Sequence, residues 1–171
     1  MSISPPDLAP PLASGGSAPS LALGSLRIAV LAATQSGNAL LVADLIAERL
    51  VSLGARSVRS IPEGAIPNPV LADSDLLIAC IASHGEGDVP DSFLPGYDAL
   101  AAADLSHLRY GLIGLGDRTY TTFCGGAWKV DSRLQQQGAR RIGEVCAIDA
   151  SAQPFPDIEA LQWLELWLRE V

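Results

Sequence analysis

Short apolar runs alternate with amphipathic stretches along most of the chain, from residue 26 onward. The apolar runs, which predict strands, cover residues 26–32, 55–61, 76–82, 110–115 and 142–148. Several of these runs are apolar at nearly every position, which is typical of strands buried on both faces. The stretches with apolar residues at helical spacing cover residues 38–53, 93–100, 126–137 and 157–171. This order predicts an α/β fold, in which helices cover both faces of a parallel sheet.

Residues 1–25 differ in character from the rest of the chain. Proline, serine, alanine and glycine dominate this segment, and Asp7 is its only charged residue. Such a composition buries too little apolar surface to offset the entropy of ordering, so it predicts a flexible tail. The segment has no basic start and its prolines interrupt each apolar run, so we do not expect a secretory signal. The remaining residues, 26–171, are predicted to form one domain.

Composition and charge exclude two classes of partner. Apolar residues make up 49% of the chain and charged residues 18%, which is enough apolar material for a sizeable core. The formal net charge is −8, so the chain lacks the positive charge with which proteins bind a nucleic-acid backbone. No apolar run approaches the roughly 18 residues needed to cross a bilayer. We therefore expect neither nucleic acid nor a membrane as a partner.

The chain contains three cysteines, Cys80, Cys124 and Cys146, which lie far apart in apolar or glycine-rich surroundings. This spacing fits neither a disulfide framework nor a zinc site built from paired ligands. It predicts reduced thiols and therefore a cytoplasmic protein.

The loop after the first predicted strand runs directly into a helix. It consists of Thr34, Gln35, Ser36, Gly37, Asn38 and Ala39. Hydroxyl groups, amide side chains and the free N–H groups of a helix start together predict a cradle for an anion such as a phosphate. No lysine or arginine lies between Arg27 and Arg49, which excludes the GxxxxGK[ST] loop of nucleotide triphosphatases, and the GxGxxG pattern is also missing. The alternative is a helix start capped by its own Ser or Asn side chain.

The loop after the third strand, residues 83–92, combines glycines with carboxylates. Gly85 and Gly87 allow a close backbone approach to a ligand, while Glu86, Asp88 and Asp91 make the loop acidic. The alternative is an acidic turn in solvent. Because ligands of open α/β sheets bind at the carboxyl ends of the strands, we expect this loop to meet the Thr34 loop.

The loop after the fourth strand, residues 114–126, carries glycines at the strand end and then Tyr120 and Phe123. This pattern predicts a platform for a flat aromatic ring. The alternative is that the two aromatic side chains only cover the sheet edge. Together, the three loops offer a phosphate cradle, a glycine-rich clamp and an aromatic platform, which suits a mononucleotide with a large planar ring.

Residues 34–39, 83–92 and 114–120 resemble the three FMN loops of flavodoxins. They also resemble the FMN domains of diflavin reductases such as the sulfite reductase flavoprotein, and within the family they are most similar to the short-chain MioC type. The similarity covers residues 26–171. It implies an α/β, flavodoxin-like, five-stranded parallel sheet of strand order 2-1-3-4-5 with helices on both faces, and FMN as the cofactor.

The resemblance also implies roles for individual residues. The segment from Thr34 to Ala39 would hold the FMN phosphate. Ser83, His84, Gly85 and Gly87 would flank the flavin ring, with the Gly85 peptide near N5, although many relatives place Tyr or Trp where His84 stands. The other side would be formed by Leu115, Gly116, Asp117, Tyr120, which stacks on the ring, Phe123 and Cys124. Asp149, after the fifth strand, is a further candidate for contact with FMN.

The function implied is that of an electron carrier, which shuttles single electrons between a flavodoxin reductase or similar donor and an acceptor enzyme. The acceptor is expected to dock on an acidic rim formed by Glu86, Asp88, Asp91 and Asp117, in which Arg118 is the one opposing charge. Two alternatives stay open, a flavin-dependent NAD(P)H or quinone reductase and a flavodoxin-fold binding module that has lost its cofactor. Trp128, Trp163 and Trp167 are predicted to lie in the core rather than on a contact surface.

Overall fold

The computed structural model describes residues 23–171 of the chain. The predicted tail, residues 1–25, therefore lies almost wholly outside the described residues. Its last three residues form a short 3-10 helix, η1 (Leu23–Ser25), in which the side chain of Leu23 is buried. The packed domain thus includes residues just before the predicted boundary at residue 26.

The strands pair in parallel in the order β2-β1-β3-β4-β5, which confirms the predicted order 2-1-3-4-5. They are β1 (Arg27–Ala33), β2 (Ser57–Ile61), β3 (Leu76–Ala82), β4 (Arg109–Gly116), β5 (Arg140–Arg141) and β6 (Cys146–Asp149). Strand β5 pairs with the beginning of β4, and β6 pairs with the end of β4 on the same edge of the sheet. The continuous apolar runs of β1, β3 and β4 lie at the centre of the sheet, as their pattern predicts.

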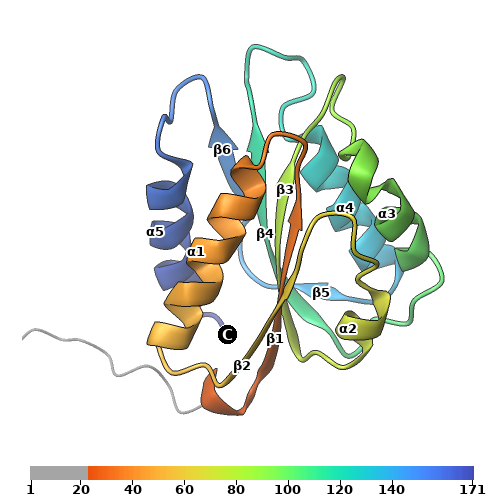
Figure 1. Ribbon diagram of the computed structural model, residues 1–171, viewed down its shortest axis with the longest axis vertical. Helices are drawn as coiled ribbons and strands as arrows, with labels where there is room; N and C mark the ends of the chain where they lie inside the picture. Colours follow the sequence, from red (N-terminus) through yellow and green to blue (C-terminus); the bar gives the residue numbers. More distant parts are fainter. Residues whose placement is uncertain (1–22) are drawn as a thin grey trace, which may run out of the picture.

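Helices cover both faces of this sheet (Figure 1). They are α1 (Asn38–Ser52), α2 (Asn68–Ala72), α3 (Leu94–Leu100), α4 (Gly125–Gln136) and α5 (Pro156–Trp167), with a 3-10 turn, η2 (Asp91–Phe93), before α3. Helices α1 and α5 pack side by side on one face, and α2, α3 and α4 lie on the other. The short helix α2 was not predicted, and α5 ends before the predicted residue 171.

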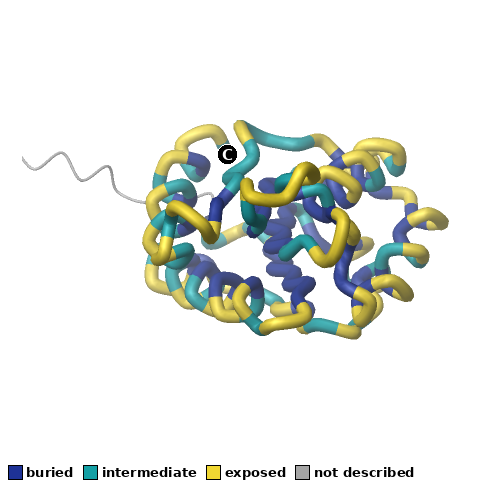
Figure 2. Tube along the Cα trace, turned by 90° about the horizontal axis from the view of Figure 1, so that it is seen from above, coloured by how far each residue is buried: buried dark blue, intermediate teal, exposed yellow. Residues whose placement is uncertain are grey.

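Each face of the sheet has its own apolar layer. Along β1, Ile28 points into the layer that contains Ile46 of α1, whereas Leu31 points into the layer that contains Val130 of α4. Figure 2 shows the buried backbone gathered inside the molecule and the exposed loops around it. The strand period of two therefore supplies both cores from one set of strands.

In place of the predicted fifth strand, residues 142–148, the structure has two pieces with other bounds: β5 (Arg140–Arg141) lies before the predicted start, and β6 (Cys146–Asp149) covers only the end of the range. Between the two pieces, Gly143 has a φ of +63°, a left-handed conformation that ends regular strand geometry. The indole N–H groups of Trp167 and Trp163 donate hydrogen bonds to the carbonyl oxygens of Ile142 (2.8 Å) and Glu144 (3.0 Å). The prediction of one continuous strand was wrong because α5 side chains take carbonyl groups that a strand would use.

The three tryptophans have different surroundings. Trp167 is 1% exposed, as expected for a core residue, and the partly buried Trp163 stacks on it with a ring-centroid distance of 5.3 Å. Trp128 is 45% exposed, so its predicted place in the core was wrong. In α4 the inward face is formed by Ala127, Val130 and Leu134, and Trp128 lies beside this face rather than on it.

Candidate cofactor-binding site

A cavity of about 460 Å³ lies at the carboxyl edge of the sheet, the upper edge in Figure 1. Its size is typical of small-molecule sites. The predicted residues that line it are Asn38, Ser83, His84, Gly85, Gly87, Leu115, Gly116, Asp117, Tyr120 and Cys124. The structure therefore brings the three predicted loops together around one space.

The loop between β1 and α1 presents a helix start without a side-chain cap. Gly37 is the N-cap residue, with a φ of 90°, and no side chain accepts a hydrogen bond from the first turn of α1. The buried Thr34 instead fixes the loop, because its Oγ1 accepts a hydrogen bond from the Gly37 N–H at 3.0 Å. The alternative of a helix capped by its own Ser or Asn side chain is wrong. Unpaired N–H groups at such a position favour an anion.

The other residues of this loop have unequal access to a ligand. Gln35 and Ser36 are exposed beside the cavity-lining Asn38, so their polar groups are free to approach a phosphate. Ala39 is fully buried and contributes only its backbone. The predicted cradle is thus a backbone feature with polar side chains at its rim.

The loop after β3 is a tight hairpin. The His84 N–H donates to the carbonyl oxygen of Asp88 at 2.8 Å, and the Asp88 N–H returns a hydrogen bond of 2.8 Å to His84. The turn places Gly85 and Gly87 at φ values of +52° and +91°. Ser83 Oγ accepts a hydrogen bond from the Gly126 N–H at 3.0 Å, which ties the hairpin to α4. This loop is a packed wall of the cavity and not only an acidic turn in solvent.

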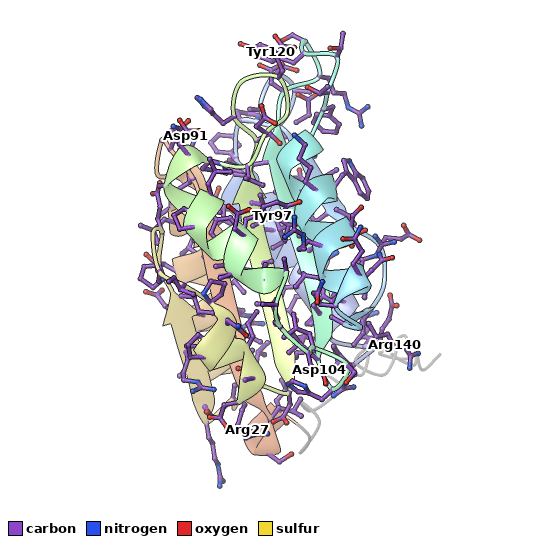
Figure 3. All side chains as sticks on the ribbon, turned by 90° about the vertical axis from the view of Figure 1, so that its right-hand side faces the viewer. Arg27, Asp91, Tyr97, Asp104, Tyr120 and Arg140 are labelled. Atoms are coloured by element: carbon purple, nitrogen blue, oxygen red, sulfur yellow. The ribbon has the colours of Figure 1, made fainter. Side chains whose placement is uncertain are left out.

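The loop after β4 forms a further wall of the cavity. Tyr120 is 60% exposed and lines the cavity, and Figure 3 shows it at the extreme upper end of the molecule. Cys124 is buried and is the one non-glycine residue in the described chain with a positive φ, 55°. Burial raises the pKa of its thiol to about 11, so Cys124 is a neutral wall residue at ordinary pH.

Phe123, predicted to close the pocket, has another partner. The Arg118 guanidinium lies over the Phe123 ring at 4.4 Å from its centroid. Among the described residues, the cavity lining contains Tyr120, Thr122 and Cys124 but not Phe123. Phe123 thus supports the loop from outside the cavity.

A fourth loop, between β6 and α5, completes the lining; sequence reasoning offered only Asp149 from this region and missed the residues that line the cavity. The loop and the adjoining ends of β6 and α5 contribute Ile148, Ala150, Gln153, Pro154 and Pro156. The signal available was its position after a strand at the ligand-binding edge. The loop is held shut by Gln153, whose Oε1 accepts from the Asp149 N–H at 2.8 Å and whose N–H donates to the Asp149 carbonyl at 2.7 Å.

Asp149 lies at the end of β6, buried behind the cavity lining. Its Oδ1 accepts hydrogen bonds from the N–H of Arg118 (3.1 Å) and from the N–H and hydroxyl of Ser151 (3.0 and 2.6 Å). These bonds lower the pKa of the Asp149 carboxyl, and the bond from the Ser151 hydroxyl has the largest effect. The carboxylate is therefore used within the protein rather than aimed into the cavity.

The acidic rim differs in one respect from the prediction. Lys129 of α4 forms an ion pair with Asp88, so Arg118 is not the one opposing charge. Asp117 accepts hydrogen bonds from the N–H and hydroxyl of Thr119 at 2.8 and 2.5 Å, which fixes its carboxylate at the cavity mouth. Of the four predicted rim carboxylates, Asp117 lines the cavity and Asp88 is paired with Lys129.

Further chemistry is limited in the part of the chain that the structure describes. Residues 23–171 contain no group of three or more His, Cys, Asp or Glu residues placed to hold a metal ion. No helix among these residues is long and apolar enough to cross a membrane. Cys80, Cys124 and Cys146 are free thiols, as predicted.

The sequence model of the family described as Flavodoxin matches residues 30–163. The chain belongs to the flavodoxin family. The predicted resemblance is thereby confirmed, and FMN and electron transfer are the cofactor and function that this family implies.

Individual relatives of this flavodoxin agree with that assignment. It is 34% identical over 148 residues to Flavodoxin YqcA of Escherichia coli K12, covering 82% of this chain and 95% of the relative. It is also 34% identical to Protein MioC of the same organism, over 146 residues and with the same coverage. The sulfite reductase flavoprotein alpha-component of Mannheimia succiniciproducens matches at 30% identity, across 85% of this chain but 24% of that protein.

Solved structures show the same fold. A mutant of flavodoxin from Pseudomonas aeruginosa, in which one cysteine is replaced by serine, superposes with a TM-score of 0.76 at 25% identity. The match covers 85% of this flavodoxin and 98% of that chain. A Fusobacterium nucleatum flavodoxin bound to flavin mononucleotide has a TM-score of 0.70 at 17% identity, covering 82% and 96%, and supports the fold alone.

Proposed function

We propose that this flavodoxin holds one FMN in the cavity at the carboxyl edge and carries electrons singly between a reductase and an acceptor enzyme. The observation that carries the proposal is the cavity itself, since an uncapped helix start, a glycine hairpin and an exposed tyrosine line one space of about 460 Å³. When bound, FMN supplies redox chemistry in one-electron steps. The protein supplies the binding, the orientation and the electrostatic surroundings.

The phosphate end of FMN fits the start of α1. Gly37, in its left-handed conformation, leaves the first N–H groups of α1 without side-chain acceptors. The positive end of the helix dipole acts in the same direction. All the donors of this loop would be neutral, because no lysine or arginine lies in it.

The flavin ring fits between the His84 hairpin and the Tyr120 loop. Tyr120 offers a ring for stacking. Gly116 lets the Cys124 backbone pack closely on the end of β4, because a Cβ on Gly116 would lie 2.8 Å from the Cys124 nitrogen. Gly85 has a φ of +52°, a left-handed conformation that favours glycine, and a Cβ built on it would meet no atom within 4 Å. We assign the Gly85 peptide as the hydrogen-bonding group nearest the reactive edge of the ring.

The rim formed by Glu86, Asp91 and Asp117 suits a partner with a basic face. Unpaired carboxylates around a redox site raise the encounter rate with such a partner, and salt weakens the effect. Asp88 contributes less, since Lys129 neutralises it. We also propose a cytoplasmic location, which the three free thiols support.

The test of the cofactor is a titration of the flavin-free chain with FMN and with riboflavin, followed by flavin fluorescence. We expect FMN to bind at one per chain, and riboflavin to bind at least tenfold more weakly because it lacks the phosphate that α1 binds. Binding of neither flavin at millimolar concentration would contradict the proposal and favour a module that has lost its cofactor.

The test of the carrier role uses the FMN-loaded chain. We expect no turnover of NADPH with a quinone by this protein alone. Once its flavin has been reduced chemically, we expect rapid electron transfer to ferric cytochrome c, a basic haem protein, at a rate that falls with added salt. Sustained NADPH-dependent quinone reduction would instead identify a reductase.

A further inference from the structure

Asp149 connects two walls of the cavity without lining it. Its residue is 6% exposed, and its carboxylate accepts hydrogen bonds from residues on both sides of the cavity mouth. On one side is Arg118, in the same loop as the lining residues Asp117 and Tyr120. On the other is Ser151, between the lining residues Ala150 and Gln153. This buried carboxylate thus joins loops that are 31 residues apart in sequence, in addition to the backbone hydrogen bond from the Ala150 N–H to the Gly116 carbonyl at 2.8 Å.

The side chain of Arg118 extends the same connection. Its Nε lies 3.6 Å from Asp149 Oδ2, and its guanidinium covers the Phe123 ring at 4.4 Å. Arg118 and Phe123 flank Tyr120 along the chain, and the Tyr120 N–H donates to the Asp117 carbonyl at 3.1 Å. The loop that carries Tyr120 is therefore fixed on both sides of this residue.

The contacts of Asp149 differ in strength. The Arg118 side chain is 68% exposed, so its ion pair with Asp149 is screened by water. The backbone N–H of Arg118 and the groups of Ser151 bond to a carboxylate that is 9% exposed, where hydrogen bonds to a charged acceptor are strong. The connection depends mainly on the acceptor oxygen and less on the charge of Arg118.

We propose that Asp149 is a positioning residue, which holds the Tyr120 loop against the β6–α5 loop and so sets how slowly FMN leaves the cavity. This inference rests on the proposed function and differs from the sequence prediction, in which Asp149 contacts FMN itself. A positioning residue acts in the protein without FMN, whereas a direct ligand acts only when FMN is bound. The two roles are therefore separable by experiment.

The first measurement is amide hydrogen exchange in the FMN-free protein. In Asp149→Ala we expect amides of residues 117–124 and 150–153 to exchange at least tenfold faster than in the parent chain, and in Asp149→Asn about threefold or less, because the amide oxygen still accepts. Unchanged exchange in Asp149→Ala would overturn the proposal. This readout does not depend on FMN, so it stays decisive even if the proposed function fails.

The second measurement is the rate of FMN release from the loaded protein. We expect Asp149→Ala to release FMN at least tenfold faster, Arg118→Ala about threefold faster, and Asp149→Asn to recover most of the slow release. The control is Tyr110→Phe, which removes a buried hydrogen bond to Asp131 on β4 and α4, away from the cavity lining. If Tyr110→Phe speeds release as much as Asp149→Ala at equal loss of stability, the effect is general destabilisation and the proposal is wrong.

Discussion

A Cβ atom on Gly125 would lie 2.6 Å from the carbonyl oxygen of Gly87. The start of α4 therefore packs backbone against backbone on the His84 hairpin, with no space for a side chain. The neighbouring Gly126 has the same constraint against the Asp88 carbonyl, at 2.7 Å. Two walls of the cavity are thus a single packed unit.

Substitution of Gly125 by alanine forces these two walls apart. We expect Gly125→Ala to lower the free energy of unfolding by about 1–3 kcal/mol and to weaken FMN binding. Urea unfolding and FMN titration measure the two effects. Gly24→Ala is the matched control, because its Cβ meets its nearest neighbour, the Gly54 carbonyl, at an ordinary 3.5 Å. Equal stability of the two variants would contradict the packing described.

Tyr120 is exposed and lines the cavity, so its contribution is to the ligand rather than to the fold. We expect Tyr120→Ala to weaken FMN binding by about three- to tenfold, the worth of one aromatic stack. Thermal unfolding of the FMN-free protein is expected to change little. Trp128→Ala removes another exposed aromatic ring, one outside the cavity lining, and is expected to leave FMN affinity unaltered. A Trp128 effect as large as that of Tyr120 would show that the stacking assignment is wrong.

Tyr110 belongs to a buried polar cluster at the other end of the sheet. Its hydroxyl donates to Asp131 Oδ1 at 2.7 Å, and Arg141 of β5 donates to Asp131 Oδ2 at 2.8 Å. In Figure 3 the adjacent Arg140 lies toward the end opposite Tyr120. We expect Tyr110→Phe to cost about 1–2 kcal/mol of stability while the dissociation constant for FMN stays the same. A change in FMN affinity would show that the two ends are coupled.

Asp75 forms a bidentate ion pair with the guanidinium of Arg27, at the start of β1. The Arg27 side-chain and backbone N–H groups lower the pKa of Asp75 from 3.8 to about 2. Because the folded pKa is the lower one, the pair stabilises the fold fully above pH 4 and loses its effect as the pH falls toward 2. Asp75→Asn is expected to be slightly less stable than the parent chain at pH 7, by a small amount since the pair is partly exposed.

The measurement is the difference in unfolding free energy between Asp75→Asn and the parent chain at pH 7, 5, 4 and 2.5. The difference is expected to be constant down to about pH 4 and to shrink below it. A difference that persists unchanged at pH 2.5 would mean that charge is not its cause.

The central strands were predictable because burial on both faces leaves a continuous apolar run, and residues 76–82 match β3 at both ends. The break between β5 and β6 was not predictable, since the segment between them is held by indole N–H groups from α5. The helix α2 has only five residues, too few for a visible period. The sequence pattern thus predicts elements whose own residues determine them, and misses those that depend on distant contacts or are too short to show a period.

The site was likewise predictable in part from the sequence. The three predicted loops meet because parallel strands place their carboxyl ends at one edge, which sequence order alone implies. The fourth wall, with Gln153 and the two prolines beside it, carries no recognisable ligand chemistry in its residues. The roles of Asp149 and Phe123 depend on Arg118, a partner distant from Asp149 in sequence, so the sequence could place both at the site but not say what they touch.

The role proposed for the cavity is to hold FMN for the transfer of electrons one at a time. The decisive measurement is a stepwise reductive titration of the FMN-loaded chain, followed by visible absorption and electron paramagnetic resonance. We expect two separate one-electron steps, with an organic radical signal that rises to a maximum near one electron per flavin and then falls. A single two-electron step with no radical at any stage would contradict this role.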